Sequence, residues 1–304
     1  MDQPVRMSTR LGRRLGRPGL WFALPALALF VVFFAYPLIA SLLQSFTTTK
    51  AGVTTPVGVE NYLRLARDPL VTQSLQNALV FLVIQVPLMI GLALGIAYVL
   101  NQSWLRARTG FRLVYFLPAV TTLVAYSMVF RVMLATDGGL VNQILGVVGI
   151  SPIDWLNNEI WAKVAVIASI TWRWTGYNMV ILLAGLQAIP AEHYEAAKID
   201  GAGRWATFFY VVVPQLRPVI VFTTITSTIG TLQLFDENFV LTGGGPSNAT
   251  ITPVLYLYKV AFRQFDFGYA SAIAWLIVVI IVIASALQFW FTREREPRAR
   301  KVRR

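Results

Sequence analysis

The polar stretch from residue 192 to residue 204 reads Glu192-His193-Tyr194-Glu195-Ala196-Ala197-Lys198-Ile199-Asp200-Gly201-Ala202-Gly203-Arg204, and it lies between two apolar segments of membrane-spanning length. Pro190 suits the first turn of a helix, and Glu192 and Glu195 place negative charge near that turn, where the helix dipole favours it. A short helix is therefore expected to begin near Ala191. It is expected to end at residues 200–203, because Asp and Gly tolerate the conformations that close a helix.

Apolar residues continue beyond this stretch. They recur at i, i+3, i+4 and i+7, as Trp205, Phe208, Phe209 and Val212. This spacing predicts a second helix with one apolar stripe. Pro214 and Pro218 are expected to break the run, because proline lacks an N–H and clashes with the preceding turn. The pattern predicts a helix–turn–helix projection outside the bilayer, here called the knob (residues 190–214).

Composition identifies an integral membrane protein. The chain has 304 residues, of which 56% are hydrophobic and only 13% are charged, far from the usual balance of a soluble domain. The absence of Cys excludes disulfides, thiolate metal sites and Cys nucleophiles. The net charge of +12 is concentrated before the first apolar run and after the last. Such flanking charges set membrane topology, and no nucleic-acid motif accompanies them.

The sequence predicts an all-α fold with six transmembrane helices. The apolar runs cover residues 20–43, 75–100, 113–134, 161–187, 219–241 and 268–291. Six spans place both termini on one side, and Lys and Arg concentrate on that side together with the knob, so the positive-inside rule assigns all three to the cytoplasm. The expected domains are a basic N-terminal tail (1–18), a transmembrane domain (19–292) and a basic C-terminal tail (293–304).

Several local features refine this scheme. Gly91-x-x-x-Gly95, with Ala93 and Ala97, predicts a small-residue face on the second span where another helix approaches closely. Pro87 is expected to kink that span. Residues 135–160 are expected to form an external loop, and a short external helix is expected from Pro253 to Phe265.

The knob resembles the EAA loop of ABC-importer membrane subunits. The matching residues are Glu195-Ala196-Ala197, Asp200-Gly201-Ala202 and Val211-Val212-Val213-Pro214, in which Val replaces the Ile and Leu typical of that family. The resemblance implies an ATPase-coupling role for Glu195, Ala196, Ala197, Asp200, Gly201, Ala202 and Pro214. Residues 57–62 resemble a segment common in the same family. The Thr-Gly-rich-Pro segment 242–246 resembles its carbohydrate-importing branch, related to the maltose, glycerol-phosphate and trehalose systems.

This resemblance implies a set of partners. Two homologous permeases pair in the bacterial cytoplasmic membrane, two copies of a separate ATPase bind their EAA loops, and an extracytoplasmic solute-binding protein delivers the substrate. The chain contains no Gly-rich nucleotide-binding loop, so ATP and Mg²⁺ are expected on the partner ATPase and no cofactor on this chain. The single histidine, His193, is expected to be a solvated or interfacial residue, and the chain is not expected to be an enzyme.

Polar residues inside the spans indicate a substrate pathway, because a charge there is costly unless it is paired or faces a water-filled cavity. Trp174, Tyr177 and Asn178 share one helix face that combines aromatic rings with an amide, a surface that suits a sugar. Gln233 and Asp236 of the fifth span are expected to complete it. The alternative for each residue is interhelical packing. Arg173 is expected either to pair with Asp236 or Glu237 or to face the cavity.

The leading function is a permease subunit of an ATP-driven importer for a sugar or a related polyol or oligosaccharide. Alternatives are an importer permease for a non-sugar solute, an ATPase-independent secondary transporter or channel, and a membrane-embedded enzyme such as a glycosyltransferase. The family does not specify which sugar is carried.

Overall fold

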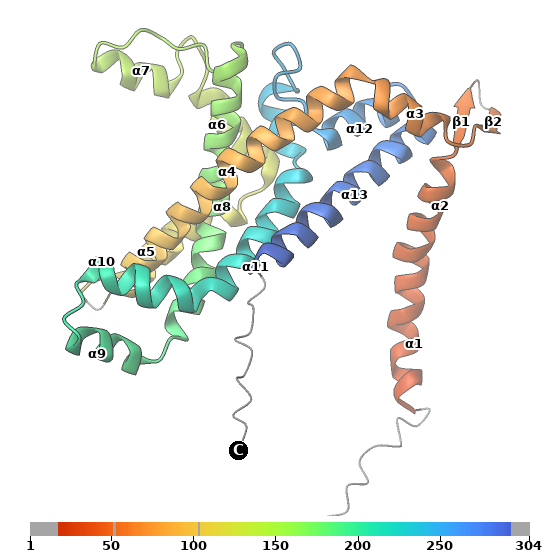
Figure 1. The fold of residues 1–304 in the computed structure, drawn as a ribbon. Coiled ribbons are helices and arrows are strands. Elements are labelled where there is room, and N and C mark those ends of the chain that lie inside the picture. Colours follow the sequence, from red (N-terminus) through yellow and green to blue (C-terminus); the bar gives the residue numbers. More distant parts are fainter. Residues whose placement is uncertain (1–17, 51–52, 103, 293–304) are drawn as a thin grey trace, which may run out of the picture.

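The structure is a computed structural model, and it describes residues 18–50, 53–102 and 104–292. Apart from Pro18, the two expected basic tails lie outside the described residues. The first span is one apolar helix made of α1 (Pro18–Phe30), a π-helical turn η1 (Val31–Ala35) and α2 (Tyr36–Gln44). An antiparallel hairpin follows, with β1 (Thr47–Lys50) paired to β2 (Val53–Pro56). This hairpin corrects the all-α expectation, although the fold is otherwise helical (Figure 1).

The central part of the chain builds most of the helical body. The short α3 (Glu60–Arg67) leads into the 33-residue α4 (Pro69–Asn101), which continues as one helix through Pro87. Then come α5 (Arg108–Val120), α6 (Leu123–Met133), α7 (Leu140–Val147) and α8 (Glu159–Gln187). The expected external loop 135–160 therefore contains a helix, α7. Its two flanking loops are held by Asn142, whose amide bonds the carbonyls of Thr136 and Ile153.

The third span, expected over residues 113–134, is broken into two helices. Helices α5 and α6 meet at an angle of 98°. Thr121 and Thr122 are extended at the bend; the Thr121 hydroxyl donates to the carbonyl of Pro118, and the Thr122 hydroxyl accepts from the N–H of Ala125 and caps α6. Side-chain hydroxyls thus satisfy backbone groups that the broken helix leaves open.

The C-terminal part contains the knob and two further long helices. The knob comprises α9 (Ala191–Ile199) and α10 (Arg204–Thr207), followed by a π-helical turn η2 (Phe208–Val212) and α11 (Val213–Leu232). After η3 (Asn238–Thr242) come α12 (Pro253–Arg263) and α13 (Phe267–Thr292). Helices are thus confirmed over most of residues 253–265 and over 268–291, where a short helix and the last span were expected. The fifth span, expected over 219–241, instead ends at Leu232.

Pro214 and Pro218 do not end a helix, contrary to expectation. Helix α10 continues through η2 into α11 as one helix from Arg204 to Leu232. In η2 the N–H of Val213 bonds the carbonyl of Phe208, five residues back. This wider turn directly precedes Pro214 and accommodates the missing N–H and the bulk of the ring. The same arrangement precedes Pro37, where the N–H of Tyr36 bonds the carbonyl of Val31.

Among the described residues, four helices are long and apolar enough to cross a membrane, and the bent pair α5–α6 makes a fifth if it counts as one span. Helix α8 is long enough but carries more polar residues. In Figure 1, α9 and the beginning of α1 lie toward one end of the molecule, whereas the hairpin, α3, α7 and α12 lie toward the other. Six spans and the orientation in a membrane stay predictions.

Helix α8 lies at the centre of the packing. The C-terminal half of α8 shares a core with α4, η2 and α11 that includes Ala93, Ala97, Met179, Leu182, Leu186, Val212 and Leu216. The small-residue face expected on α4 is thus half right: Ala93 and Ala97 are fully buried there, whereas Gly91 and Gly95 are exposed and a Cβ on either would meet no atom within 4 Å. Gly176 marks a closer contact, because its Cβ would lie 1.7 Å from the carbonyl oxygen of Tyr115 on α5.

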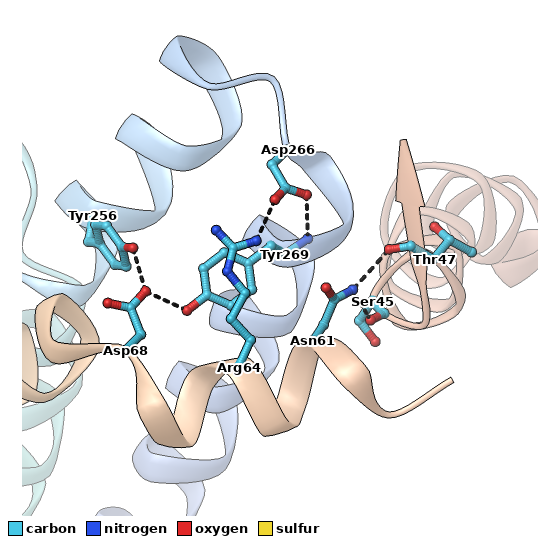
Figure 2. A network of polar contacts seen from close by, with 8 residues as sticks. All are labelled: Ser45, Thr47, Asn61, Arg64, Asp68, Tyr256, Asp266 and Tyr269. Atoms are coloured by element: carbon cyan, nitrogen blue, oxygen red, sulfur yellow. Dashed lines mark hydrogen bonds and ion pairs between the residues drawn. The ribbon is translucent and has the colours of Figure 1, made fainter. Parts of the chain in front are cut away.

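A polar network joins α3 to the ends of the first and last spans (Figure 2). Asn61 donates to the carbonyls of Ser45 and Thr47, 2.8 and 2.9 Å away. Arg64 forms an ion pair of 2.7 Å with Asp266, and its guanidinium lies 3.7 Å from the ring centre of Tyr269. The network brings together residues some 200 positions apart in the sequence.

Candidate functional site

A cavity of about 440 Å³ opens beside the middle of α8. Its walls come from α4, α6, α8 and the last turns of α11, together with the segment after α11 where the backbone leaves the helix. Gln85 and Met89 contribute from α4. Non-helical backbone inside a membrane protein is tolerated where it lines a cavity. The early end of α11 at Leu232 allows the chain to turn along the cavity wall.

All five residues expected in a substrate pathway line this cavity: Trp174, Tyr177, Asn178, Gln233 and Asp236. The rings of Trp174 and Tyr177 are edge to face, with centroids 5.7 Å apart, and Tyr177 is 39% exposed. Gln233 is exposed and Asp236 is partly exposed. The two aromatic rings and these two polar side chains thus present stacking surface and hydrogen-bonding groups to one hollow.

Asn178 is placed differently from its neighbours. It is only 2% exposed, and its amide donates to the carbonyl of Trp174 at 3.1 Å while accepting from Ser227 on α11 at 3.4 Å. Thr231 of α11 in turn donates to Gln85 of α4 at 3.0 Å. These bonds form a polar layer across α4, α8 and α11. The amide of Asn178 therefore contributes mainly to packing between helices, the alternative given for it in the sequence analysis.

Arg173 does not form the expected ion pair with Asp236 or Glu237 among the described residues. Its guanidinium lies 4.7 Å from the ring centre of Tyr126, and the hydroxyl of Tyr126 donates to Glu237 at 2.5 Å. The Tyr126 ring therefore stands between the two charges, because the bend between α5 and α6 brings α6 against α8. Arg173 is buried and absent from the cavity lining.

Sequence reasoning missed several lining residues. Gln85, Met89, Ser227, Thr231 and Glu237 line the cavity as well. The richness of span five in Thr and Ser was the available signal for Ser227 and Thr231. Nothing local distinguishes Gln85, which reaches the cavity only because α4 packs along α8. In the part of the chain that the structure describes, no group of three His, Asp or Glu side chains is placed to hold a metal ion.

The knob begins with the helix expected from the sequence. Helix α9 spans Ala191–Ile199, and Gly201 follows with φ of +74°. The N–H of Gly201 bonds the carbonyl of Lys198, and the N–H of Ala202 bonds that of Ala197, the two bonds of a Schellman motif. The left-handed conformation expected at this glycine is confirmed.

The residues expected to act in coupling divide into two groups by exposure. Glu195, Ala196, Asp200, Gly201 and Pro214 are exposed, whereas Ala197 is buried and Ala202 is partly buried. His193 is exposed, as expected. The apolar stripe predicted on the second helix is also divided. Phe208 and Val212 pack into the core with α4 and α8, while Trp205 and Phe209 are 76% and 57% exposed.

The fold thus combines long apolar helices with a cavity between them and an exposed helical projection. The family model described as "Binding-protein-dependent transport system inner membrane component" matches residues 88–297. The chain belongs to this family of ABC-importer permeases.

Similar proteins carry sugar-related names. The lactose transport system permease protein LacF of Rhizobium radiobacter is 48% identical over 283 residues, which cover 91% of this chain and 95% of LacF. The arabinooligosaccharides transport system permease protein AraP of Halalkalibacterium halodurans is 36% identical over 270 residues, covering 88% and 85%.

Solved structures show the same fold. A bacterial ABC transporter involved in the import of the acidic polysaccharide alginate matches with a TM-score of 0.78 at 21% identity, covering 91% of this chain and 96% of that chain. A second alginate transporter structure, in complex with an alginate pentasaccharide-bound periplasmic protein, matches with the same TM-score at 22% identity. At this identity the likeness concerns the fold alone.

Proposed function

We propose that this chain is a permease subunit of an ATP-driven importer that passes a sugar into the cytoplasm of a bacterial cell. The observation that carries this proposal is the cavity beside α8, which combines two aromatic rings with exposed amide and carboxylate groups. Sugars stack their C–H faces on aromatic rings and bond their hydroxyls to amides and carboxylates. The names of LacF and AraP support the same class of cargo.

Coupling to ATP hydrolysis would use the knob. The exposed α9 and Gly201 turn are offered to a separate ATPase, and Tyr194 connects α9 to the core around α8. The helix that starts at Arg204 in the knob continues to Leu232, and Thr226, Ser227 and Thr231 in its last turns line the cavity. A displacement of the knob would therefore be carried along this helix to the cavity wall.

The complete transporter would contain a second permease, two ATPase subunits and an extracytoplasmic binding protein. The periplasmic protein in the alginate transporter complex supports the last of these partners. Each permease would supply part of the solute pathway, since importers release substrate through a cavity between the two.

Reconstitution tests the proposal. The purified complex in proteoliposomes, with its binding protein, is expected to accumulate labelled lactose or arabinotriose only when ATP is supplied on the ATPase side. Tyr177→Ala should lower uptake roughly 5-fold, because loss of one stacking surface costs about 1 kcal/mol, while ATP hydrolysis without substrate stays normal. Tyr36→Ala, on the exposed first span, is the matched control. Uptake that continues without ATP would identify a secondary transporter instead.

A further inference from the structure

The cavity carries negative charge without a matching positive charge in its lining. Asp236 and Glu237 both line it, and no Lys, Arg or His among the described residues does. Arg173 is absent from this lining, and its guanidinium lies 4.7 and 5.5 Å from the ring centres of Tyr126 and Trp174. The charged side chains that a solute meets in the described lining are therefore both carboxylates.

The two carboxylates are held differently. Glu237 is 3% exposed and accepts the hydrogen bond of Tyr126, whose ring faces Arg173, so its charge is engaged inside the wall. Asp236 is partly exposed, and its side chain has no hydrogen bond or ion pair to any described residue. The side chain of Gln233, three positions earlier, likewise has no hydrogen bond to a described residue. Asp236 is thus the carboxylate in the lining that remains open to a solute.

From this asymmetry, and resting on the proposed function, we infer that the cavity selects neutral sugars over acidic ones and that Asp236 is the residue that determines this preference. A sugar hydroxyl donates to a carboxylate in a charge-assisted hydrogen bond, which is stronger than a bond between neutral groups. A sugar carboxylate at the same place has no proton to donate and is repelled. Two like charges repel most strongly at contact distance, so an acid bound beside Asp236 is disfavoured.

The test compares two sugars that differ in one group: lactose, and lactose in which a carboxylate replaces the galactose hydroxymethyl group. Binding is measured by saturation-transfer NMR on the complete permease–ATPase complex in nanodiscs. The binding protein is left out, so that its own selectivity does not contribute. The wild-type complex is expected to bind lactose at least ten-fold more tightly than the acid.

Two variants locate the preference. Asp236→Asn keeps an acceptor but removes the charge, and it should narrow the ratio to about three-fold. Gln233→Lys leaves Asp236 in place and adds a cation to the cavity lining, and it should also narrow the ratio of lactose to acid binding. Glu159→Gln, at the exposed beginning of α8, removes a carboxylate outside the cavity and should leave the ratio unchanged.

The inference is overturned if the wild-type complex binds both sugars equally, or if Asp236→Asn keeps the wild-type ratio at normal yield and monodispersity. Equal binding of lactose and the acid would contradict the charge preference but not the sugar-importer function. If neither sugar binds, the result counts against the sugar-importer function as well, so the two failures are distinguishable.

Discussion

Gly201 shows how much depends on one backbone angle in the knob. Its φ of +74° is a conformation that only glycine adopts without strain, and a Cβ there would meet no atom within 4 Å. The requirement is thus conformational rather than steric. Gly203, two residues later, has φ of −68° and is equally open, so the two positions differ in backbone conformation and little else.

This difference predicts an uncoupled variant. Gly201→Val should strain or shift the turn, because a side chain in the left-handed region costs roughly 1–2 kcal/mol, and the exposed α9 would then present another surface to the ATPase. We expect normal membrane insertion, with uptake and substrate-stimulated ATP hydrolysis both reduced more than about 5-fold. The matched Gly203→Val should transport nearly as well as wild type. Equal activity of the two valine variants would show that the turn plays no part in coupling.

At the level of elements, α3 fastens the N-terminal hairpin to the C-terminal helices. Asp68, at the end of α3, accepts hydrogen bonds of 2.6 Å from the hydroxyls of both Tyr256 and Tyr269, as Figure 2 shows. Burial alone would raise the pKa of Asp68, but these two bonds and the N–H of Leu70 outweigh it and bring the pKa below its usual value. Burial is the main cause that raises the pKa of the Tyr256 hydroxyl, and its hydrogen bond to Asp68 raises this pKa further.

Asp68→Asn should therefore lower thermal stability in a pH-dependent way. A carboxyl with a depressed pKa stabilises the fold above its unfolded pKa, near 4, and loses that contribution as pH falls through the lower folded value. At pH 7 the variant is expected to unfold roughly 2–4 °C below wild type, and the gap should shrink as pH falls below about 4. Thermal unfolding followed by size-exclusion fluorescence measures it. Asp137→Asn, at an exposed turn, should show no gap; a gap for Asp68→Asn that is constant with pH would disagree with this account.

At the level of the whole molecule, the absence of Cys makes orientation directly measurable. His193 on α9 and Val147 at the end of α7 are both exposed, Val147 by 88%, and Figure 1 places α9 and α7 at opposite ends of the fold. With six spans, His193→Cys should react with an impermeant maleimide only from the cytoplasmic side and Val147→Cys only from outside. Labelling of intact cells and of inverted vesicles distinguishes the sides. Reaction of both cysteines from one side would require a different number of crossings.

Local sequence was sufficient for α9 with its closing turn and for the polar face of α8. The boundaries of α9 follow from Pro190, early acids and a closing glycine, and Trp174 and Tyr177 share a face through helical spacing alone. Interactions within a few residues determine such features, so neighbours in the sequence carry the information. The same holds for the terminal helices α12 and α13, whose limits follow from hydropathy and proline.

Tertiary structure alone decided the rest. The bend between α5 and α6 places Tyr126 between Arg173 and Glu237. No local sequence pattern predicts that an aromatic ring takes this position in place of an ion pair. Two π-helical turns carry helices past Pro37 and Pro214, where the local rule predicts breaks. Gln85 joins Thr231 across 146 positions. The charge and the amide share one physical reason: the cost of burying either depends on which groups pack against it, and those groups come from distant parts of the chain.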